Sequence, residues 1–456
     1  MPFLPFPLFT DVLLWLLMGA IALYVWYCSR KPHLGAPWAR VFQSRTAAIC
    51  AVVFGCYVAI GFADSLHFRV RLQQAAGSEG TPYSPAVLSV LDLALTHLRE
   101  RRERTYSAPL ATRLYAKEQF EIDGKPVRDF PRLRYGGARL QDEAERPRDI
   151  AARIGLGLFV AAFAAVLIGL AVKRLRRRRP QIPWSAGGAT LLGVLAAALP
   201  VLFLSFEYHV FGTDKVGQDV LYQALKSIRI SLIIGTLTTL VLLPLGMALG
   251  VMAGYFKGWI DDAIQYLYTT LNSIPGVLLI AAAVLMMQVV IDRHAEWFST
   301  AEQRADLRLL VLCAILGLTS WTGLARLLRG EALKLSQLEY IQAAHAFGVA
   351  DTRILTRHIL PNVAHIVIIA MVMDFSGLVL AEAVLSYVGV GVDPATTSFG
   401  TMINAARLEM GREPIVWWSL AAAFVFMFVL VLAANLFADA VRDGFDPRVR
   451  MGFVPA

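Results

Sequence analysis

The chain has 456 residues, 57% of them hydrophobic, and its mean hydropathy of +0.57 is far above that of soluble globular proteins. This composition excludes a soluble globular protein and favours an all-α polytopic membrane protein. Charged residues make up 17%, more than membrane helices alone would carry, so we also expect sizeable aqueous segments. The net charge of +9 does not indicate a nucleic-acid partner, because the basic residues cluster beside apolar runs, as the positive-inside rule predicts.

Nine apolar runs are long enough to cross a membrane, since a spanning helix needs about 20 residues. Basic residues follow the first and third runs, most densely at 173–179, which predicts that these loops are cytoplasmic. Alternation then predicts the N-terminus, 65–151 and 207–229 outside, and the C-terminal stretch 441–450 inside. The first run lacks a basic leader and a clear cleavage site, so we interpret it as a retained anchor. The runs are 8–28, 47–64, 152–172, 187–206, 230–254, 272–291, 308–326, 362–384 and 416–437.

The external segment 65–151 is the least regular part of the chain. Residues 84–104 have the pattern of an amphipathic helix, and 119–127 contain an Asp-Gly turn with alternation, which predicts a small hairpin. The remainder, to Arg148, is polar and irregular. A folded accessory domain and a poorly ordered insert both fit this pattern, and we assign the segment no chemistry.

The stretch 339–361 is a polar, basic island between two apolar runs, and it predicts two short helices. Gly348 can end the first helix, because only glycine enters the left-handed position there without steric cost. We predict Asp351 as the N-cap of the second helix and Pro361 as the end of the unit. The pattern favours a cytoplasmic docking surface; an ordinary loop is the alternative. The first helix should present one face that is made of Tyr340, Ala344 and Phe347.

The same stretch resembles the EAA loop of ABC importer permeases, the segment that docks on the ATPase subunit. The family pattern appears as Gln342-Ala343-Ala344, Gly348 and His358-Ile359-Leu360-Pro361, with Gln in place of Glu and His in place of Ile. The stretch 357–362 is similar to the form common in the oligopeptide, dipeptide and nickel branch. The resemblance implies that ATPase coupling involves Tyr340, Gln342, Ala343, Ala344, Phe347, Gly348, Arg357, His358, Leu360 and Pro361.

Two further stretches resemble signatures of this branch, at 211–221 and 381–391. Gln218 stands where the first signature usually has arginine. Between them, Gly246, Gly250 and Gly254 form a small-residue stripe, which we interpret as ordinary helix packing. The signature residues are Gly212, Thr213, Asp214, Gly217 and Asp219 in the first stretch, and Glu382, Ser386, Gly389 and Gly391 in the second.

Asp374 and Glu382 are ionisable residues in or near a predicted span, where they are costly in lipid. They are candidates for the translocation path, and a structural hydrogen bond inside the helix bundle is the alternative for each.

The resemblance implies a six-helix permease core, for which two assignments fit. In the one that we favour, 47–64 is the first core helix and 152–206 is an inserted transmembrane hairpin; in the other, 187–206 is the first core helix. The predicted divisions are an anchor and basic loop at 1–46, the helix at 47–64, the external insert at 65–151, the hairpin at 152–206, the core at 207–450 with its coupling loop at 339–361, and a tail at 451–456.

No phosphate-binding loop, zinc-protease motif or nucleophile elbow occurs in the sequence, and the eight histidines are scattered. We therefore expect no catalytic residue, no metal site and no cofactor on this chain. The four cysteines lie in apolar runs and should be small buried residues: Cys28, Cys50, Cys56 and Cys313.

The resemblance implies a multi-pass permease subunit of an ATP-driven importer in the bacterial inner membrane, with peptides favoured as substrates. It also implies a homologous second permease, two ATPase subunits that hold ATP and magnesium, and an external solute-binding protein. An ion-gradient-driven carrier or channel is the alternative class, and a nickel or other small-solute importer is the alternative within the family.

Overall fold

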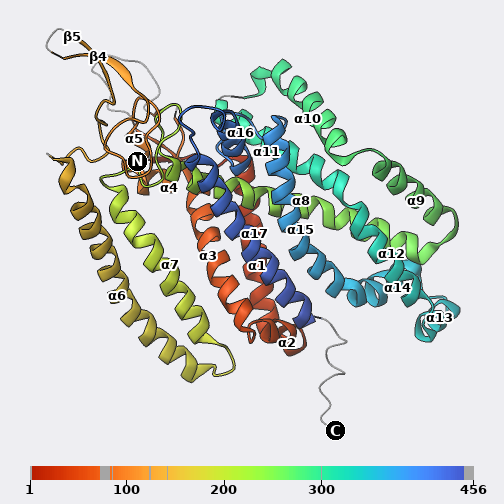
Figure 1. Ribbon diagram of the computed structural model, residues 1–456. Helices are drawn as coiled ribbons and strands as arrows, with labels where there is room; N and C mark the ends of the chain where they lie inside the picture. The colour runs from red at the N-terminus through yellow and green to blue at the C-terminus, as the bar shows by residue number, and fades with distance from the viewer. Residues whose placement is uncertain are drawn as a thin grey trace. The chain divides into compact units, whose positions relative to one another are not determined.

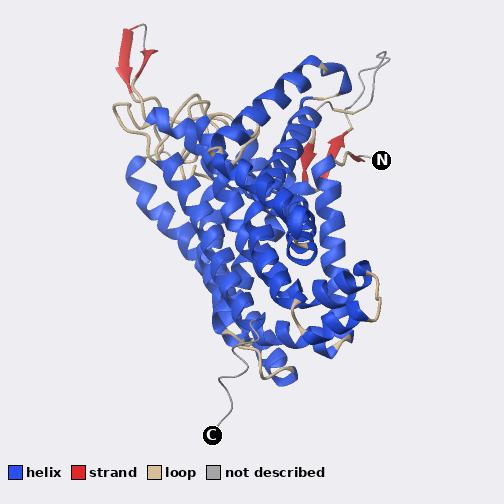
Figure 2. Ribbon diagram, turned by 90° about the vertical axis from the view of Figure 1, so that its right-hand side faces the viewer, coloured by secondary structure: helices blue, strands red, loops and turns tan. Residues whose placement is uncertain are grey.

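The computed structural model describes residues 3–71, 83–84, 86–122, 125–140, 142–298 and 300–445. Within this part of the chain, nine helices are long and apolar enough to span a membrane, and strands are few and short (Figures 1 and 2). This confirms the predicted all-α polytopic class. The predicted tail at 451–456 and the end of the C-terminal stretch, 446–450, lie outside the described residues.

The chain divides into two compact units. Unit 1 comprises residues 1–8, 42–232 and 394–433, and unit 2 comprises 9–41, 233–393 and 434–456. The long helices α8 (Val220–Phe256) and α17 (Trp418–Phe445) each contribute residues to both units.

In unit 1, α3 packs closely on the beginnings of α8 and α17. A Cβ on Gly61 of α3 would lie 2.5 Å from Leu232 Cδ1, so the two helices approach where glycine leaves room. The Tyr57 hydroxyl donates to the carbonyl oxygen of Phe426 over 2.9 Å. Besides parts of α8 and α17, the helices of unit 1 are α3 (Arg45–Ser65), α4 (Val90–Ala94), α5 (Thr96–Glu100), η1 (Glu143–Glu145), α6 (Arg146–Arg178), α7 (Trp184–Ser205) and α16 (Phe399–Glu409).

The two long helices α6 and α7 form a hairpin (Figure 1). A Cβ on Gly157 of α6 would lie 2.6 Å from the backbone of Pro200 in α7, so side chains are excluded at this crossing. The helix α7 also packs on α3. The hairpin therefore packs on the side of α3.

The strands of unit 1 form one three-stranded and one two-stranded sheet, both antiparallel. The predicted hairpin is confirmed, with Gln119 opposite Arg128, although the turn residues 123–124 lie outside the described part. The prediction of one helix over 84–104 is wrong. A capping box between Ser89 and Asp92 starts α4, and the backbone at Leu95 then interrupts the helix. The strands are β1 (Phe3–Pro5), β2 (His67–Val70), β3 (Leu88–Ser89), β4 (Glu118–Ile122) and β5 (Lys125–Asp129).

Unit 2 contains the first apolar helix together with most of the later ones. The backbone N–H of Thr10, in α1, donates to a carboxylate oxygen of Asp306, in α11, over 3.0 Å, and the Thr10 hydroxyl donates to the other oxygen. The first helix is thus tied to α11. Besides parts of α8 and α17, the helices of unit 2 are α1 (Phe9–Arg30), α2 (Pro32–Val41), α9 (Gly258–Ser273), α10 (Gly276–Arg293), η2 (Ala295–Trp297), α11 (Ala301–Ser320), α12 (Thr322–Ser336), α13 (Glu339–Ala346), α14 (Asp351–Ile354), η3 (Leu355–Ile359) and α15 (Leu360–Val388).

The glycine stripe of α8 packs on α12. A Cβ on Gly250 would lie 2.5 Å from the carbonyl oxygen of Ala325, and one on Gly254 would lie 2.6 Å from Ala332 Cβ. Gly246 similarly faces Leu324. The stripe therefore serves close helix packing, as we interpreted it from the sequence.

The four cysteines are free thiols. Three of them are buried as expected, at positions 28, 50 and 313, and Cys56 is half-buried.

Candidate coupling surface and signature loops

The helix α13 ends at Gly348 in a Schellman turn. Gly348 has φ +72°, and its N–H donates to the carbonyl of His345 over 3.0 Å, while Val349 N–H donates to the carbonyl of Ala344 over 3.1 Å. This is the left-handed stop that the sequence predicts at this position.

The exposed face of α13 is centred on two aromatic side chains. Phe347 is 87% exposed and Tyr340 is 47% exposed, whereas Ala344 is half-buried on the underside beside the fully buried Ile341. The predicted face is therefore divided: its aromatic residues point outward and Ala344 packs inward. Gln342 and Ala343 are also exposed.

Beneath α13 lies an apolar cluster built from α8, α9, α12, α14 and α15, which includes the fully buried Leu328. Two polar contacts brace this base. The Tyr255 hydroxyl donates to Asp351 Oδ1 over 2.6 Å, and the Arg329 guanidinium forms a bidentate pair with Asp261 at 2.6 and 2.7 Å. The Arg329 partner lowers the pKa of Asp261, which keeps this carboxylate charged. The stretch 339–361, which we call the elbow, thus rests on a fixed support.

The predictions for Asp351 and Pro361 are wrong. Asp351 is the first residue of α14, Ala350 is the N-cap, and the Asp351 carboxylate bonds Tyr255 rather than the helix N-terminus. Pro361 does not end the unit either. One continuous helix runs from Asp351 to Val388, with Pro361 in the first turn of α15.

A π-helical turn explains how the helix continues through Pro361. The N–H of Leu360 donates to the carbonyl of Leu355, five residues earlier, so the turn contains one extra residue. In an ordinary α-helix, residues 354 and 359 would be about 140° apart. The wider turn brings Ile354, Ile359 and Val363 onto one fully buried face.

The remaining coupling candidates lie beside this turn. Arg357 is exposed, and Leu360 is half-buried in the cluster. The His358 ring is tilted against the ring of Tyr340 at 6.0 Å between centroids, and Asn362 Nδ2 donates to the Tyr340 hydroxyl over 3.3 Å. The structure therefore brings the two halves of the elbow together around Tyr340.

The first signature stretch forms a tight loop before α8. Gly212 has φ +70° and Gly217 has φ +72°. A Cβ on Gly217 would lie 1.9 Å from the carbonyl oxygen of Glu103, and one on Gly212 would lie 2.4 Å from that of Ser107. Both glycines are therefore required, because each has a left-handed backbone and lies in close contact with the insert at 65–151.

The polar signature residues hold this loop together. The Thr213 hydroxyl accepts from Ser107 N–H over 2.7 Å and donates to the Thr105 carbonyl over 2.9 Å. Asp214 Oδ1 accepts from the N–H of Gln218 over 2.8 Å. Asp219 Oδ1 accepts from the N–H of Leu221 over 2.8 Å, which caps the start of α8.

A buried histidine between two carboxylates was not predicted from the sequence. His209 Nδ1 lies 2.7 Å from Asp219 Oδ2, and its Nε2 lies 3.5 Å from Glu103 Oε1. Glu103 also accepts from three backbone N–H groups, at residues 134–136. Burial lowers the pKa of His209, but the two carboxylates outweigh it and raise the pKa to about 9. Burial raises the pKa of Glu103, and His209 with the three N–H groups lowers it below its usual value.

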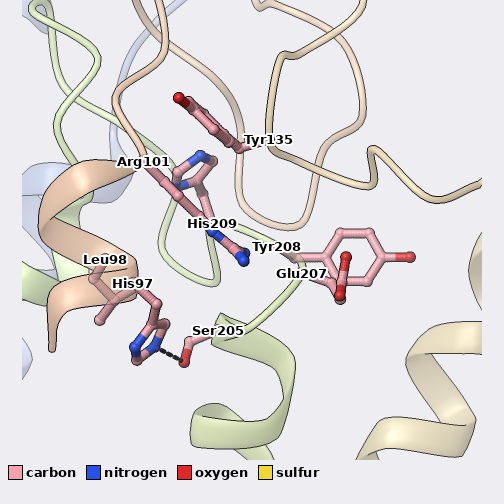
Figure 3. A pocket seen from close by; sticks show the side chains of 8 residues that line it. All are labelled: His97, Leu98, Arg101, Tyr135, Ser205, Glu207, Tyr208 and His209. Carbon is pink, nitrogen blue, oxygen red and sulfur yellow. Dashed lines mark hydrogen bonds between the residues drawn. The ribbon is translucent and has the colours of Figure 1, made fainter. Parts of the chain in front are cut away.

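Figure 3 shows the shallow hollow beside this histidine, where His97 reaches toward the end of α7. His97 Nε2 lies 3.0 Å from Ser205 Oγ, whose hydroxyl also lies 2.7 Å from the Leu202 carbonyl. The first contact joins the insert to the hairpin, and the second lies within α7.

A second buried cluster joins the insert to the start of α8. Lys226 Nζ lies 2.9 Å from Asp64 Oδ1 and 3.0 Å from Asp92 Oδ1, and the Tyr222 hydroxyl donates to Asp92 over 2.7 Å. Both aspartates are nearly inaccessible. The described part of the insert is therefore folded onto the helices α3 and α8.

The second signature stretch forms the C-terminal turn of α15. Gly389 has φ +89°, and a Cβ on Gly391 would lie 2.0 Å from Ser386 Oγ. The Ser386 hydroxyl donates to Glu382 Oε1 over 2.7 Å. This geometry favours a structural hydrogen bond for Glu382, which is fully buried. Asp374 is half-buried halfway along α15 and makes no ion pair within the described part of the chain.

Comparison with known proteins agrees with these signatures. The family model described as binding-protein-dependent transport system inner membrane component matches residues 246–451. The oligopeptide transport system permease protein OppC of Mycobacterium tuberculosis is 32% identical over 296 residues, covering 62% of this chain and 94% of that protein. The glutathione transport system permease protein GsiD of Pectobacterium atrosepticum is 34% identical, covering 53% and 73%.

A solved structure of the inward-facing MetNI methionine ABC transporter is 15% identical with a TM-score of 0.36, covering 49% of this chain and 97% of that chain. This likeness is too distant to support an argument. With OppC matched over nearly its whole length, the chain belongs to the binding-protein-dependent transport system inner membrane component family, the permease subunits of ABC importers.

Proposed function

We propose that this permease imports peptides, and that it works in a complex with a homologous second permease, two ATPase subunits and an external solute-binding protein. The names of the relatives OppC and GsiD, which refer to oligopeptide and glutathione transport, support a peptide substrate. ATP and magnesium would be held by the ATPase subunits. A carrier driven by an ion gradient is not favoured by these relatives.

The single observation that carries the coupling proposal is the exposed aromatic face of α13 on a braced base. Phe347 is 87% exposed at the tip of the elbow, and the Schellman turn at Gly348 fixes its direction. A rigid element with a protruding aromatic residue suits insertion into a groove on a partner. In this proposal, ATP-driven closure of the ATPases moves the elbow, and the core helices then alternate between inward-open and outward-open states.

Substitution Gly348→Val tests the coupling proposal. Valine is β-branched and disfavours the φ of +72°, so the end of α13 should be displaced. We expect at least about a tenfold loss of ATP-dependent uptake together with loss of ATPase co-purification. Gly330→Val is the matched control, because a Cβ there meets open space in a regular helix. Normal uptake with normal assembly in Gly348→Val would overturn the docking proposal.

The substrate is tested by uptake of labelled peptides into vesicles that hold the reconstituted complex with its binding protein. We expect ATP-dependent accumulation of dipeptides or longer peptides. Accumulation of a nickel complex without peptide uptake would instead favour the small-solute branch of the family.

For the core we propose that α3 is the first helix and that α6 and α7 form an inserted hairpin. The close packing of Gly61 on Leu232 and the bond from Tyr57 to Phe426 support this assignment.

A further inference from the structure

The helix α6 carries an exposed apolar stripe along much of its length. Four large residues of this stripe are at least 60% exposed, and they follow one another at intervals of three or four positions, as residues on one helical face do. They are Phe159, Phe163, Val166 and Leu170.

The same stripe continues into basic residues at the end of α6. Arg174 and Arg177 are exposed and lie within about 40° of the direction of Leu170 around the helix axis, at 100° per residue. Arg176 and Arg178 are also exposed, but they point at least about 80° away from that direction. Figure 1 shows this end of α6 at the turn into α7, opposite the end that adjoins the external segment of unit 1.

Nothing on the hairpin neutralises these charges. No acidic residue occurs between Ile150 and Phe206, whereas Lys173, Arg174 and the four arginines at 176–179 are all exposed. The positive-inside rule explains a basic loop by charge count alone. It does not require that two of the arginines continue an apolar stripe.

The part of the stripe from Phe163 onward, together with Arg174, matches one leaflet of a bilayer in length. From Phe163 to Arg174 the helix rises about 16 Å, roughly half of the ~30 Å hydrocarbon core. An acyl chain along the stripe would therefore place its phosphate beside Arg174 and Arg177. A nearby indole, Trp184, donates from Nε1 to the carbonyl of Arg179 over 3.0 Å and marks the interface at this end.

We propose that the stripe of α6 with Arg174 and Arg177 is a binding site for one anionic phospholipid, with its acyl chain on the aromatic and aliphatic residues and its phosphate between the two arginines. Guanidinium groups bind phosphate through several charge-assisted hydrogen bonds, and basic clusters beside a spanning helix attract anionic lipid. The site anchors the α6–α7 hairpin in the leaflet on its basic side.

The test measures lipid retention by the full-length chain purified in detergent, using native mass spectrometry. Phosphatidylglycerol and phosphatidylcholine with identical acyl chains are the probes. For wild type we expect one phosphatidylglycerol to be retained preferentially, and R174Q/R177Q should weaken its binding by about 30-fold, the product of two basic contacts. Size-exclusion behaviour and helical content establish that each variant is folded.

The matched control is R176Q/R178Q, which removes the same charge from the same turn of the helix but away from the stripe. It should change phosphatidylglycerol binding by less than about threefold. Equal losses in both pairs would mean diffuse electrostatic attraction and would overturn the site, as would unchanged binding in R174Q/R177Q.

Two further arms identify what occupies the stripe. Glycerol 3-phosphate should not compete at the concentration of the lipid, because it lacks the acyl chain; full competition would mean a soluble phosphate site instead. Retention should also persist in the assembled complex purified from membranes. Its loss there would mean that a protein subunit covers the stripe, which would overturn the proposal.

Discussion

A histidine buried between two carboxylates holds the insert at 65–151 against the signature loop before α8. His209 contacts Asp219, which caps α8, and faces Glu103, which is anchored by three backbone N–H groups of the insert. Removing one partner of such a buried ionic group leaves the others unpaired, which commonly costs about 3–5 kcal/mol. This side chain should therefore control the stability of unit 1.

The first prediction concerns pH. The pKa of His209 is raised from 6.5 to about 9, so its stabilisation is fully present below pH 6.5 and is lost as the pH rises through 9. The apparent unfolding temperature of the full-length chain in detergent should fall across this range. In His209→Gln it should already be low at pH 6.5 and should change little up to pH 9.

The control is His345→Gln, which replaces an exposed histidine of α13. It should keep the wild-type pH dependence. An unchanged slope in His209→Gln would show that another group causes the alkaline loss.

A second prediction at the residue scale is that Phe347→Ala weakens ATPase binding without affecting folding. Phe347 is 87% exposed, so its truncation removes little buried area within this chain. We expect a loss of about 2 kcal/mol or more in ATPase binding, as for an aromatic hot spot, measured by co-purification and titration. Leu408→Ala, at a position of α16 that is 70% exposed, should bind ATPase as wild type does. Equal ATPase binding by the two variants would show that Phe347 is not part of the contact.

Local rules predicted some residues and missed others, and the difference is physical. Gly348 was predictable because a left-handed helix end depends on a few neighbouring residues. The role of Asp351 was not, because its partner Tyr255 lies 96 positions earlier in the chain and outcompetes local capping. His209 was missed for the same reason, since Glu103 is remote in sequence.

At the scale of elements, the spans and the β4–β5 hairpin followed from apolar length and turn residues, but the ends of helices often did not. Pro361 predicts a boundary by local sterics, whereas the π-helical turn at 355–359 absorbs the proline and continues the helix. The extra residue is stabilised because it places Ile354, Ile359 and Val363 in buried positions. Tertiary packing thus outweighed the local tendency of Pro361 to end a helix.

The crossing of α8 and α12 gives a prediction about packing. In Gly250→Leu the new side chain must displace α12, because even a Cβ would lie 2.5 Å from the Ala325 carbonyl oxygen. We expect a destabilisation of about 1–3 kcal/mol or more, seen as a lower unfolding temperature in detergent. Gly323→Leu, where a Cβ meets open space in the exposed face of α12, should be nearly neutral. Comparable losses in both variants would contradict the close-packing role.

At the scale of the whole molecule, the number of spans followed from the sequence, since hydrocarbon thickness fixes the length of an apolar helix. The fold of the insert did not, because its order depends on contacts such as Lys226 with Asp64 and Asp92 that join distant segments. We propose from the charge pattern that the N-terminus is external and the C-terminus cytoplasmic.

Single cysteines test this topology in intact cells with an exposed outer face of the membrane. Arg128→Cys, in the insert, should react with a membrane-impermeant thiol reagent, and His345→Cys, in the elbow, should react only after the membrane is opened. The native cysteines are buried or half-buried, which keeps the background low. Protection of residue 128 in these cells would reverse the proposed orientation.

The unbroken helix from Asp351 to Val388 has a mechanical consequence. At 1.5 Å per residue it is a single rod of roughly 55 Å, with the elbow at one end and the Glu382–Gly391 turn at the other. If the helix moves as one body, a tilt imposed on the elbow end displaces the other end in the opposite direction, about whatever point the bundle holds fixed. The π-helical turn at 355–359 lies at the elbow end, where such a helix can kink, and the left-handed Gly389 ends it at the other.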